Sequence, residues 1–196
     1  MTAFTAAASF QNARSSGQSA NAHSALLNGE ILLCTQPHSA WGGAVTAQMY
    51  LPRARSHVWQ EITNYSRWVH FFPDLVQSEV VGKSEGSERT SKRKRLYQVA
   101  RKAFFLLSVQ VEIYLNVIES IQHSTRQQIQ FVMEKGSFQD FSADLQLQDY
   151  EQGTLLTYSV KATPSIPVPS ALVQEAMKLD LPTNMKQMRQ VICDAS

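Results

Sequence analysis

VWQEITNYSRWVHFFPDLVQSEVV, residues 58–81, is the stretch that decides the fold, because a helical pattern runs through an aromatic cluster into a strand. Val58, Ile62 and Tyr65 recur at helical spacing and predict an amphipathic helix. The second half of the stretch is too aromatic for an exposed loop, so we expect its rings to fold back and become buried. Pro73 then ends any helix, and an extended chain follows it.

Downstream of this stretch, the spacing of apolar residues changes from a period near 3.6 to a period of 2, which indicates a sheet. In residues 109–117 every odd position is aliphatic and every even position is polar or tyrosine, so one face of this strand is covered. The same alternation recurs in residues 129–133, 141–147 and 156–162. Short polar or glycine-containing connections are expected at residues 83–91, 119–124, 135–137 and 150–153. We therefore predict an antiparallel meander of about six strands.

The C-terminal part of the chain changes pattern again. Three prolines in residues 163–169 exclude a central strand and predict an extended connector. A helix is expected to begin at Pro169 or Ser170, since an apolar stripe follows at helical spacing. Pro182 interrupts this stripe, so the sequence predicts one long kinked helix or two collinear helices. Because the dry face of the sheet needs a cover, we predict an α+β fold: a curved antiparallel sheet around this helix, with a hydrophobic cavity between them.

The N-terminal residues differ in composition from the rest. Residues 1–24 are rich in Ala, Ser, Asn and Gln and lack acidic residues, which is typical of disorder. We expect a disordered tail over residues 1–28 and one domain over residues 29–196, because 196 residues with 43% hydrophobic content suffice for one core. The pattern is not that of a secretory signal, whereas an organelle transit peptide stays an alternative. The pattern predicts strands at residues 31–33 and 44–51, and we interpret the two segments as one long strand broken by a bulge.

With this order of elements, the sequence resembles the START-like, SRPBCC superfamily of helix-grip proteins, and within it the polyketide cyclase/dehydrase and coenzyme Q-binding branch. The resemblance covers roughly residues 44–191. The residues that carry it are Val58, Trp59, Thr63, Asn64, Tyr65, Trp68, Phe71, Phe72, Pro73, Leu75, Val76, Ser78, Glu79, Val80, Gly136, Ser137 and Phe138. It implies a helix-grip fold.

The resemblance also implies that the cavity binds or transports an apolar small molecule, such as a lipid or an isoprenoid quinone. The residues expected to line it come from the aromatic cluster, the strands and the C-terminal helix. They are Trp68, Phe71, Phe72, Val111, Ile113, Phe131, Met133, Tyr158, Leu172 and Met177. Each is also a residue that an ordinary core uses, so a purely structural role stays open.

Two other functions stay open: an aromatase or cyclase acting on a polyketide-like or aromatic substrate, and a protein-interaction role like that of ribosome-associated members. A cyclase needs an acid and a base in a dry cavity. The candidates are Arg67, His70, Glu112, Tyr114, Asp140 and Asp144. We expect Glu112, Tyr114, Asp140 and Asp144 to be solvent-exposed and His70 to be structural, so no catalytic residue is assigned. The spacing of histidines and cysteines predicts no metal site, and no cofactor motif is present.

Net charge is only +2, yet basic residues cluster in the first half of a strand around residues 89–102. Lys92, Arg93, Lys94 and Arg95 form its centre and are candidates for peripheral contact with anionic lipid, although charge that protects a sheet edge explains them equally well. Few aromatic residues are interleaved with them, so nucleic acid is not expected as a partner. Two distant cysteines and no membrane-length apolar run are typical of a cytoplasmic protein with reduced thiols.

Overall fold

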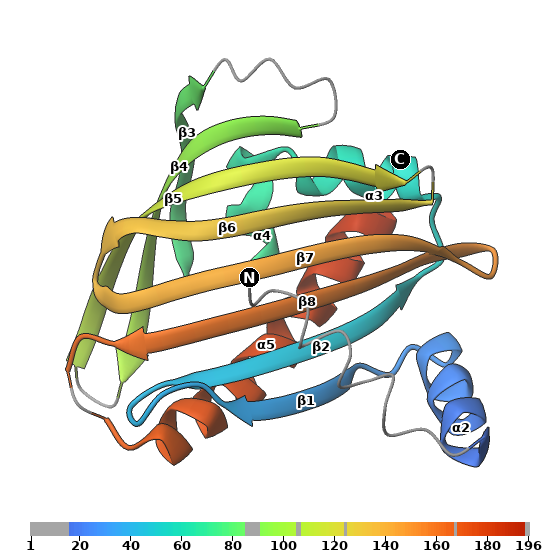
Figure 1. The fold of residues 1–196 in the computed structure, drawn as a ribbon, viewed down its shortest axis with the longest axis horizontal. Coiled ribbons are helices and arrows are strands. Elements are labelled where there is room, and N and C mark those ends of the chain that lie inside the picture. The colour runs from blue at the N-terminus through green and yellow to red at the C-terminus, as the bar shows by residue number, and fades with distance from the viewer. Residues whose placement is uncertain (1–15, 85–90, 105–106, 124, 167, 195–196) are drawn as a thin grey trace.

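In the computed structural model, one antiparallel sheet curves around a long C-terminal helix, and Figure 1 shows this helix, α5, lying across the sheet. The structure describes residues 16–84, 91–104, 107–123, 125–166 and 168–194. The helices are α2 (Ser16–Leu27), α3 (Arg55–Ile62), the 3₁₀ turn η1 (Tyr65–Arg67), α4 (Trp68–Phe71) and α5 (Ser170–Asp194). The strands are β1 (Leu32–Pro37), β2 (Gly43–Leu51), β3 (Leu75–Ser84), β4 (Ser91–Phe104), β5 (Leu107–His123), β6 (Arg126–Gly136), β7 (Phe138–Tyr150) and β8 (Gly153–Pro164).

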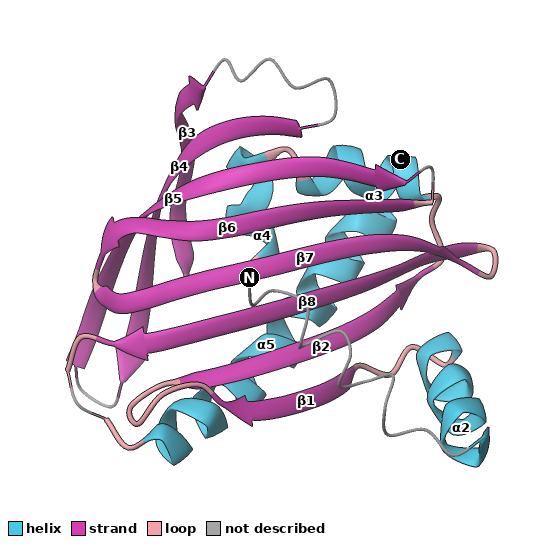
Figure 2. Cartoon of the chain, viewed as in Figure 1, coloured by secondary structure: helices cyan, strands magenta, loops and turns pink. Residues whose placement is uncertain are grey.

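The strands β3 to β8 form the predicted meander, since each pairs with its neighbour in sequence. Over the described residues the sheet has eight strands in the order β1-β2-β8-β7-β6-β5-β4-β3, and all pairs are antiparallel. Figure 2 shows α3, α4 and α5 on the same side of this sheet. The predicted α+β helix-grip architecture is thereby confirmed.

One prediction about the first strand was wrong. The segments 31–33 and 44–51 are not one strand broken by a bulge but belong to an antiparallel pair, in which Leu32 lies opposite Gln48. The chain reverses between Pro37 and Gly43, and β2 then pairs with β8. This pairing joins the first strands to the end of the meander, and α5 packs against β2 and β1.

The strand β5 is longer than predicted. Residues 119–124, expected as a connection, continue β5 as far as His123, and Glu119 therefore faces the interior of the sheet. At the other end of the β5–β6 pair, Gly136 lies so close to β5 that a Cβ atom there would stand 2.5 Å from the carbonyl oxygen of Glu112. Only glycine permits this close approach of two backbones.

The core lies between the sheet and the helices. Inward residues of the strands, such as Met49, Leu115 and Leu145, are almost fully buried. The C-terminal half of α5 covers them with Leu181, Met185, Met188 and Ile192. Of the two predicted alternatives, the structure has one continuous helix through Pro182, which has no N–H to donate to the preceding turn.

The described part of the N-terminal tail is helical rather than disordered. Residues 16–27 form α2, and Leu26 near its end is only 3% exposed. Gly29, with φ of 85°, ends this helix in a Schellman motif: its N–H bonds to the Leu26 carbonyl, and that of Glu30 bonds to the Ala25 carbonyl. Composition alone missed this helix because the packing of one leucine and a terminating glycine stabilises it. Residues 1–15, the rest of the predicted tail, lie outside the described residues, as does Arg89 of the basic cluster.

Candidate functional site

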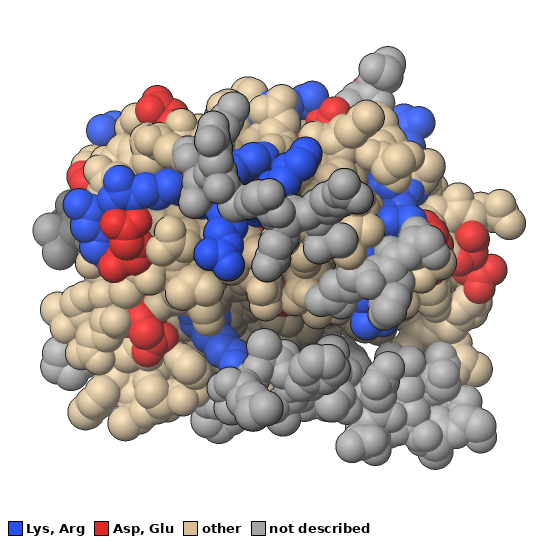
Figure 3. Space-filling model, turned by 45° about the horizontal axis from the view of Figure 1, so that its top comes forward, with Lys and Arg blue, Asp and Glu red and all other residues tan. Residues whose placement is uncertain are grey.

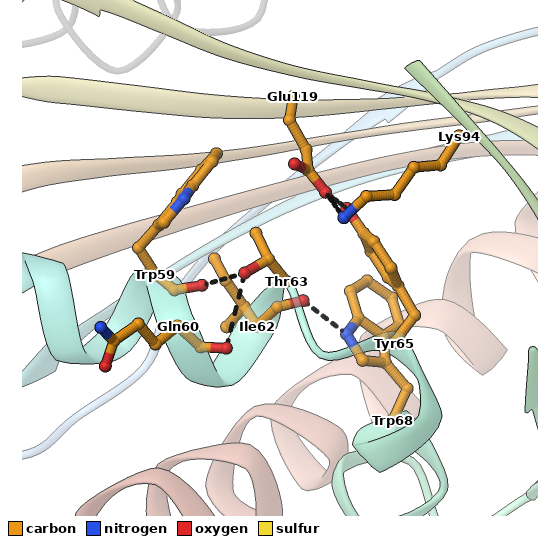
Figure 4. Close-up of polar contacts among 8 residues, drawn as sticks. All are labelled: Trp59, Gln60, Ile62, Thr63, Tyr65, Trp68, Lys94 and Glu119. Carbon is orange, nitrogen blue, oxygen red and sulfur yellow. Dashed lines mark hydrogen bonds and ion pairs between the residues drawn. The ribbon is translucent and has the colours of Figure 1, made fainter. Parts of the chain in front are cut away.

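The aromatic stretch folds back under the sheet, as its composition predicted. Figure 4 shows the Trp68 indole N–H donating to the Ile62 carbonyl oxygen at 2.8 Å, which closes the chain from α3 back onto α4. The ring of Trp68 lies 5.1 Å from that of Phe131 on β6 and 5.3 Å from that of Phe72. Tyr65 packs edge-on against Phe131. These contacts fix the aromatic residues as one wall beneath the sheet.

A cavity of about 250 Å³ lies between this wall, the inner face of the sheet and α5. Its lining is mostly apolar. Residues of both β2 and β4 contribute to it, because the sheet curves and brings these two distant strands to the same cavity. The lining residues are Val45, Trp68, Phe72, Asp74, Leu75, Gln98, Ala100, Phe141, Tyr158, Val160, Met177, Asp180, Leu181 and Asn184. The volume is near the lower end of the range for small-molecule sites, roughly 300–1,000 Å³.

Four of the ten residues expected at the site line this cavity: Trp68, Phe72, Tyr158 and Met177. The others lie elsewhere in the fold. Phe71, Ile113 and Phe131 are buried within the core, Met133 packs against that core, and Val111 is half-buried. Leu172 is 62% exposed, because the first turns of α5 extend beyond the surface that the sheet covers.

Sequence reasoning missed Val45, Phe141 and Val160. For Val160 a signal was present, because it is two residues from Tyr158 on the same strand and therefore faces the same side. For Val45 and Phe141 there was none, since they enter the lining through the pairing of β2 and β7 with β8. The polar members Gln98, Asp74 and Asn184 were also missed; they reach the lining from β4, from the turn before β3 and from α5.

Tyr158 stands out among the polar groups of the lining. Its side chain is only 5% exposed, and its hydroxyl has no hydrogen-bond partner among the described residues. Burial raises the pKa of this phenol, so the group stays protonated and remains a hydrogen-bond donor. Gln98, by contrast, donates its amide to the Ser78 hydroxyl at 3.1 Å. The charged residues of the described lining, Asp74 and Asp180, are both acidic.

A second buried polar group lies outside the cavity and was not predicted. Glu119, only 6% exposed, accepts a hydrogen bond from the Tyr65 hydroxyl at 2.7 Å and pairs with the Lys94 ammonium at 2.5 Å (Figure 4). The Lys94 ammonium also lies 4.9 Å from the centre of the Tyr65 ring. Burial and the adjacent carboxylate both raise the pKa of Tyr65. This triad ties η1 to β4 and β5 and so holds the aromatic wall in place.

The candidate catalytic residues do not meet in the cavity. Arg67 pairs with Glu61 at 2.8 Å, and His70 is exposed. On the strands, Asp140 contacts His38 at 2.9 Å, while Glu112 and Tyr114 lie apart from the cavity on the sheet.

Asp144 is less exposed than the sequence predicted. It is half-buried and accepts hydrogen bonds from Gln128 and Gln146, and burial raises the pKa of its carboxyl group. In the described part of the chain, no group of three or more His, Cys, Asp or Glu side chains is arranged to hold a metal ion.

The basic cluster does not form one surface, because strand alternation sends its side chains to opposite faces of β4. Lys94 points inward to Glu119, whereas Arg95 forms a bidentate pair with Glu134 at 2.6 and 2.7 Å. Lys92 and Arg93 are exposed. Figure 3 shows basic and acidic side chains interspersed on this side of the molecule. Among the described residues, no helix is both long and apolar enough to cross a bilayer.

Comparison with solved structures finds the same fold. A protein of Thermus thermophilus is 20% identical with a TM-score of 0.63, and the match covers 78% of this chain and 99% of that one. The STAR-related lipid transfer protein of Xanthomonas axonopodis is 13% identical with a TM-score of 0.66, covering 83% and 93%. The aromatase/cyclase Zhui of a Streptomyces species is 6% identical with a TM-score of 0.51, covering 84% and 92%.

Sequence comparison gives the family. No curated protein sequence matches the chain. The family model described as polyketide cyclase/dehydrase and lipid transport, however, matches residues 51–189, which run from the end of β2 nearly to the end of α5. This match contains the aromatic stretch, the meander and most of the cavity lining. The polyketide cyclase/dehydrase part of the resemblance is confirmed, and the chain belongs to the polyketide cyclase/dehydrase and lipid transport family.

Proposed function

We propose that the protein binds and carries a hydrophobic small molecule, of the lipid or isoprenoid quinone type, in the cavity beneath the sheet. The observation that carries this proposal is the cavity itself: an open cavity of about 250 Å³ lined by Val45, Phe72, Leu75, Val160 and other mostly apolar side chains. Burying the apolar surface of a ligand there removes it from water, and the mostly apolar lining gives up few hydrogen bonds in return.

The size of the cavity sets the expected affinity. A ligand portion as large as an aromatic side chain buries ~150–250 Å². At ~25 cal/mol per Å², this burial contributes about 4–6 kcal/mol before the loss of translational freedom is counted. Without that loss, about 4–6 kcal/mol corresponds to a Kd of about 0.04–1 mM, so such a fragment binds no more tightly than this, and a ligand that also covers the mouth of the cavity binds more tightly.

The test is native mass spectrometry of the purified protein, followed by denaturing extraction and identification of any released molecule. A retained apolar molecule that is lost on filling the cavity, as in Val160→Trp, supports the proposal. Leu172→Trp is the matched control, because Leu172 lies outside the cavity and is exposed. A protein that releases no apolar ligand and binds none of a panel of lipids and quinones contradicts it.

A cyclase is the second candidate, and Tyr158 is the observation that favours it. A protonated phenol that lines a mostly apolar cavity is suited to donate a proton or a hydrogen bond to a carbonyl oxygen. Among the described residues, Asp74 and Asp180 are the carboxylates of the lining and the only candidates there for a base. Turnover of an aromatic polyketide that Tyr158→Phe abolishes, with substrate binding retained, favours this candidate over a carrier.

The same proposal includes a cytoplasmic location, with peripheral contact with a membrane through which the apolar ligand is exchanged. The structure restricts the basic contact to Lys92 and Arg93, because Lys94 and Arg95 are engaged in ion pairs. Each exposed basic group near an anionic surface contributes about 1 kcal/mol. Co-sedimentation with vesicles containing anionic lipid checks this contact, with Lys92→Glu/Arg93→Glu as the variant.

A further inference from the structure

We infer that the ligand of this cavity carries an uncharged oxygen acceptor, and that the Tyr158 hydroxyl donates a hydrogen bond to it. The inference rests on the proposed binding function and specifies the chemical class that the cavity selects. It assigns Tyr158 as the residue that orients the ligand.

The first step is the state of the Tyr158 hydroxyl. Buried polar groups in proteins are nearly always hydrogen-bonded, because leaving one without a partner is unfavourable. Tyr158 lines the cavity, no described residue bonds its hydroxyl, and the hydroxyl is not one of the sealed side-chain atoms that lack a partner, so water in the open cavity can reach it. A ligand that displaces this water has to offer an acceptor in its place. The other fully or nearly buried tyrosine, Tyr65, donates to Glu119. A ligand acceptor in the cavity would give Tyr158 the partner that Tyr65 already has.

The second step is the charge of that acceptor. A buried anion needs a cation or several hydrogen bonds to offset its lost hydration. The charged residues of the described lining are Asp74 and Asp180, which repel an anion. The side chains around Tyr158 on the same face, Leu156 and Val160, are apolar. A ketone, quinone, ester or ether oxygen therefore suits this environment, whereas a carboxylate or phosphate does not.

The third step is size. The cavity volume of about 250 Å³ is slightly below the usual range for small-molecule sites, roughly 300–1,000 Å³. This space accommodates one or two fused rings, or part of a single chain, but not the two chains of a phospholipid. The selected class is therefore compact, apolar and neutral, with one oxygen acceptor near Tyr158.

The experiment uses three probes of nearly equal shape: 2-acetylnaphthalene, 2-ethylnaphthalene and 2-naphthoate. Binding of each to the full chain is measured at pH 8 by titration calorimetry, with the change in tryptophan fluorescence, to which Trp68 in the lining contributes, as a second readout. One hydrogen bond from a buried donor should make the ketone bind about two- to tenfold more tightly than the hydrocarbon. The carboxylate should bind more weakly than both.

Tyr158→Phe removes the hydroxyl and keeps the ring. In this variant the ketone and the hydrocarbon should bind equally, with affinity for the hydrocarbon unchanged. Tyr97→Phe is the matched control, because its hydroxyl contacts Glu112 on an exposed part of the sheet and the variant should keep the wild-type preference. Circular dichroism confirms that both variants are folded.

The possible results separate the two proposals. Equal binding of ketone and hydrocarbon to the wild-type protein, or a preference that survives Tyr158→Phe, overturns the inference and leaves the hydrophobic cavity as a binding site. Tightest binding of the naphthoate overturns the assignment of a neutral ligand. If none of the three probes binds, the proposed function fails and the inference fails with it.

Discussion

Replacing Lys94 with methionine should destabilise the fold far more than an exposed lysine normally does. Its ammonium lies 2.5 Å from a carboxylate oxygen of Glu119, which is 6% exposed, while Lys94 itself is 20% exposed. Removing one partner of a buried pair costs about 3–5 kcal/mol, because the other charge stays buried without compensation. The partial exposure of Lys94 places the expected loss of unfolding free energy at the lower end, about 3 kcal/mol.

The variant Glu119→Gln tests the reason for that loss. The amide still accepts the Tyr65 hydrogen bond and brings no charge into the core, so we expect a loss of about 1 kcal/mol. In the double variant Lys94→Met/Glu119→Gln no uncompensated charge remains, and its loss should be about 1–2 kcal/mol rather than the sum of the single losses. The coupling energy is therefore about 2–3 kcal/mol.

Urea unfolding at pH 7, followed by circular dichroism, measures all four proteins of this cycle. The adjacent Arg95→Met is the matched control: its partner Glu134 is exposed, so its loss should stay below about 1 kcal/mol. Coupling below about 0.5 kcal/mol, or a Lys94→Met loss no larger than that of Arg95→Met, would refute the reasoning, because the Glu119 charge would then be hydrated in the folded protein.

Three further outcomes are expected. Tyr158→Phe should leave the ligand-free protein about as stable as wild type in urea, because no described residue bonds its hydroxyl and the open cavity lets water reach it. A clear loss of stability would show that the hydroxyl is bonded within the protein. Stability should be retained up to pH 10, the unfolded pKa of tyrosine, and fall above it, because folding raises the pKa values of Tyr65 and Tyr158. Above pH 10 the unfolding free energy should fall by up to about 1.4 kcal/mol per pH unit for each of these two phenols. Unfolding measured from pH 9 to 11 should therefore show a smaller fall for Tyr158→Phe, which lacks one of them. Gly136→Ala should lower the melting temperature, because the new Cβ would overlap with the Glu112 carbonyl and reduce the unfolding free energy by about 1–3 kcal/mol. Gly82→Ala should have a smaller effect, since its Cβ would meet only ordinary contacts.

Local patterns in the sequence determined much of the fold. Helical spacing from Val58 to Tyr65 and the aromatic run after it predicted the fold-back that the Trp68 contacts now show. Alternation in residues 109–117 predicted the inward face of β5, and the prolines before Ser170 predicted the start of α5. These features are local, because periodicity and proline geometry act within one element and need no partner to be recognised.

Only the tertiary structure decided where the site is. Alternation shows which face of a strand is apolar, but whether space remains beneath that face depends on sheet curvature and on where α5 crosses it. Thus Trp68 and Tyr158 line the cavity while Phe71 and Phe131, equally apolar, are packed in the core. The pairing of β4 with β5 likewise brings Lys94 to Glu119, a contact between residues 25 positions apart. Such contacts depend on strand register and on packing between elements distant in sequence, and no single segment contains that information.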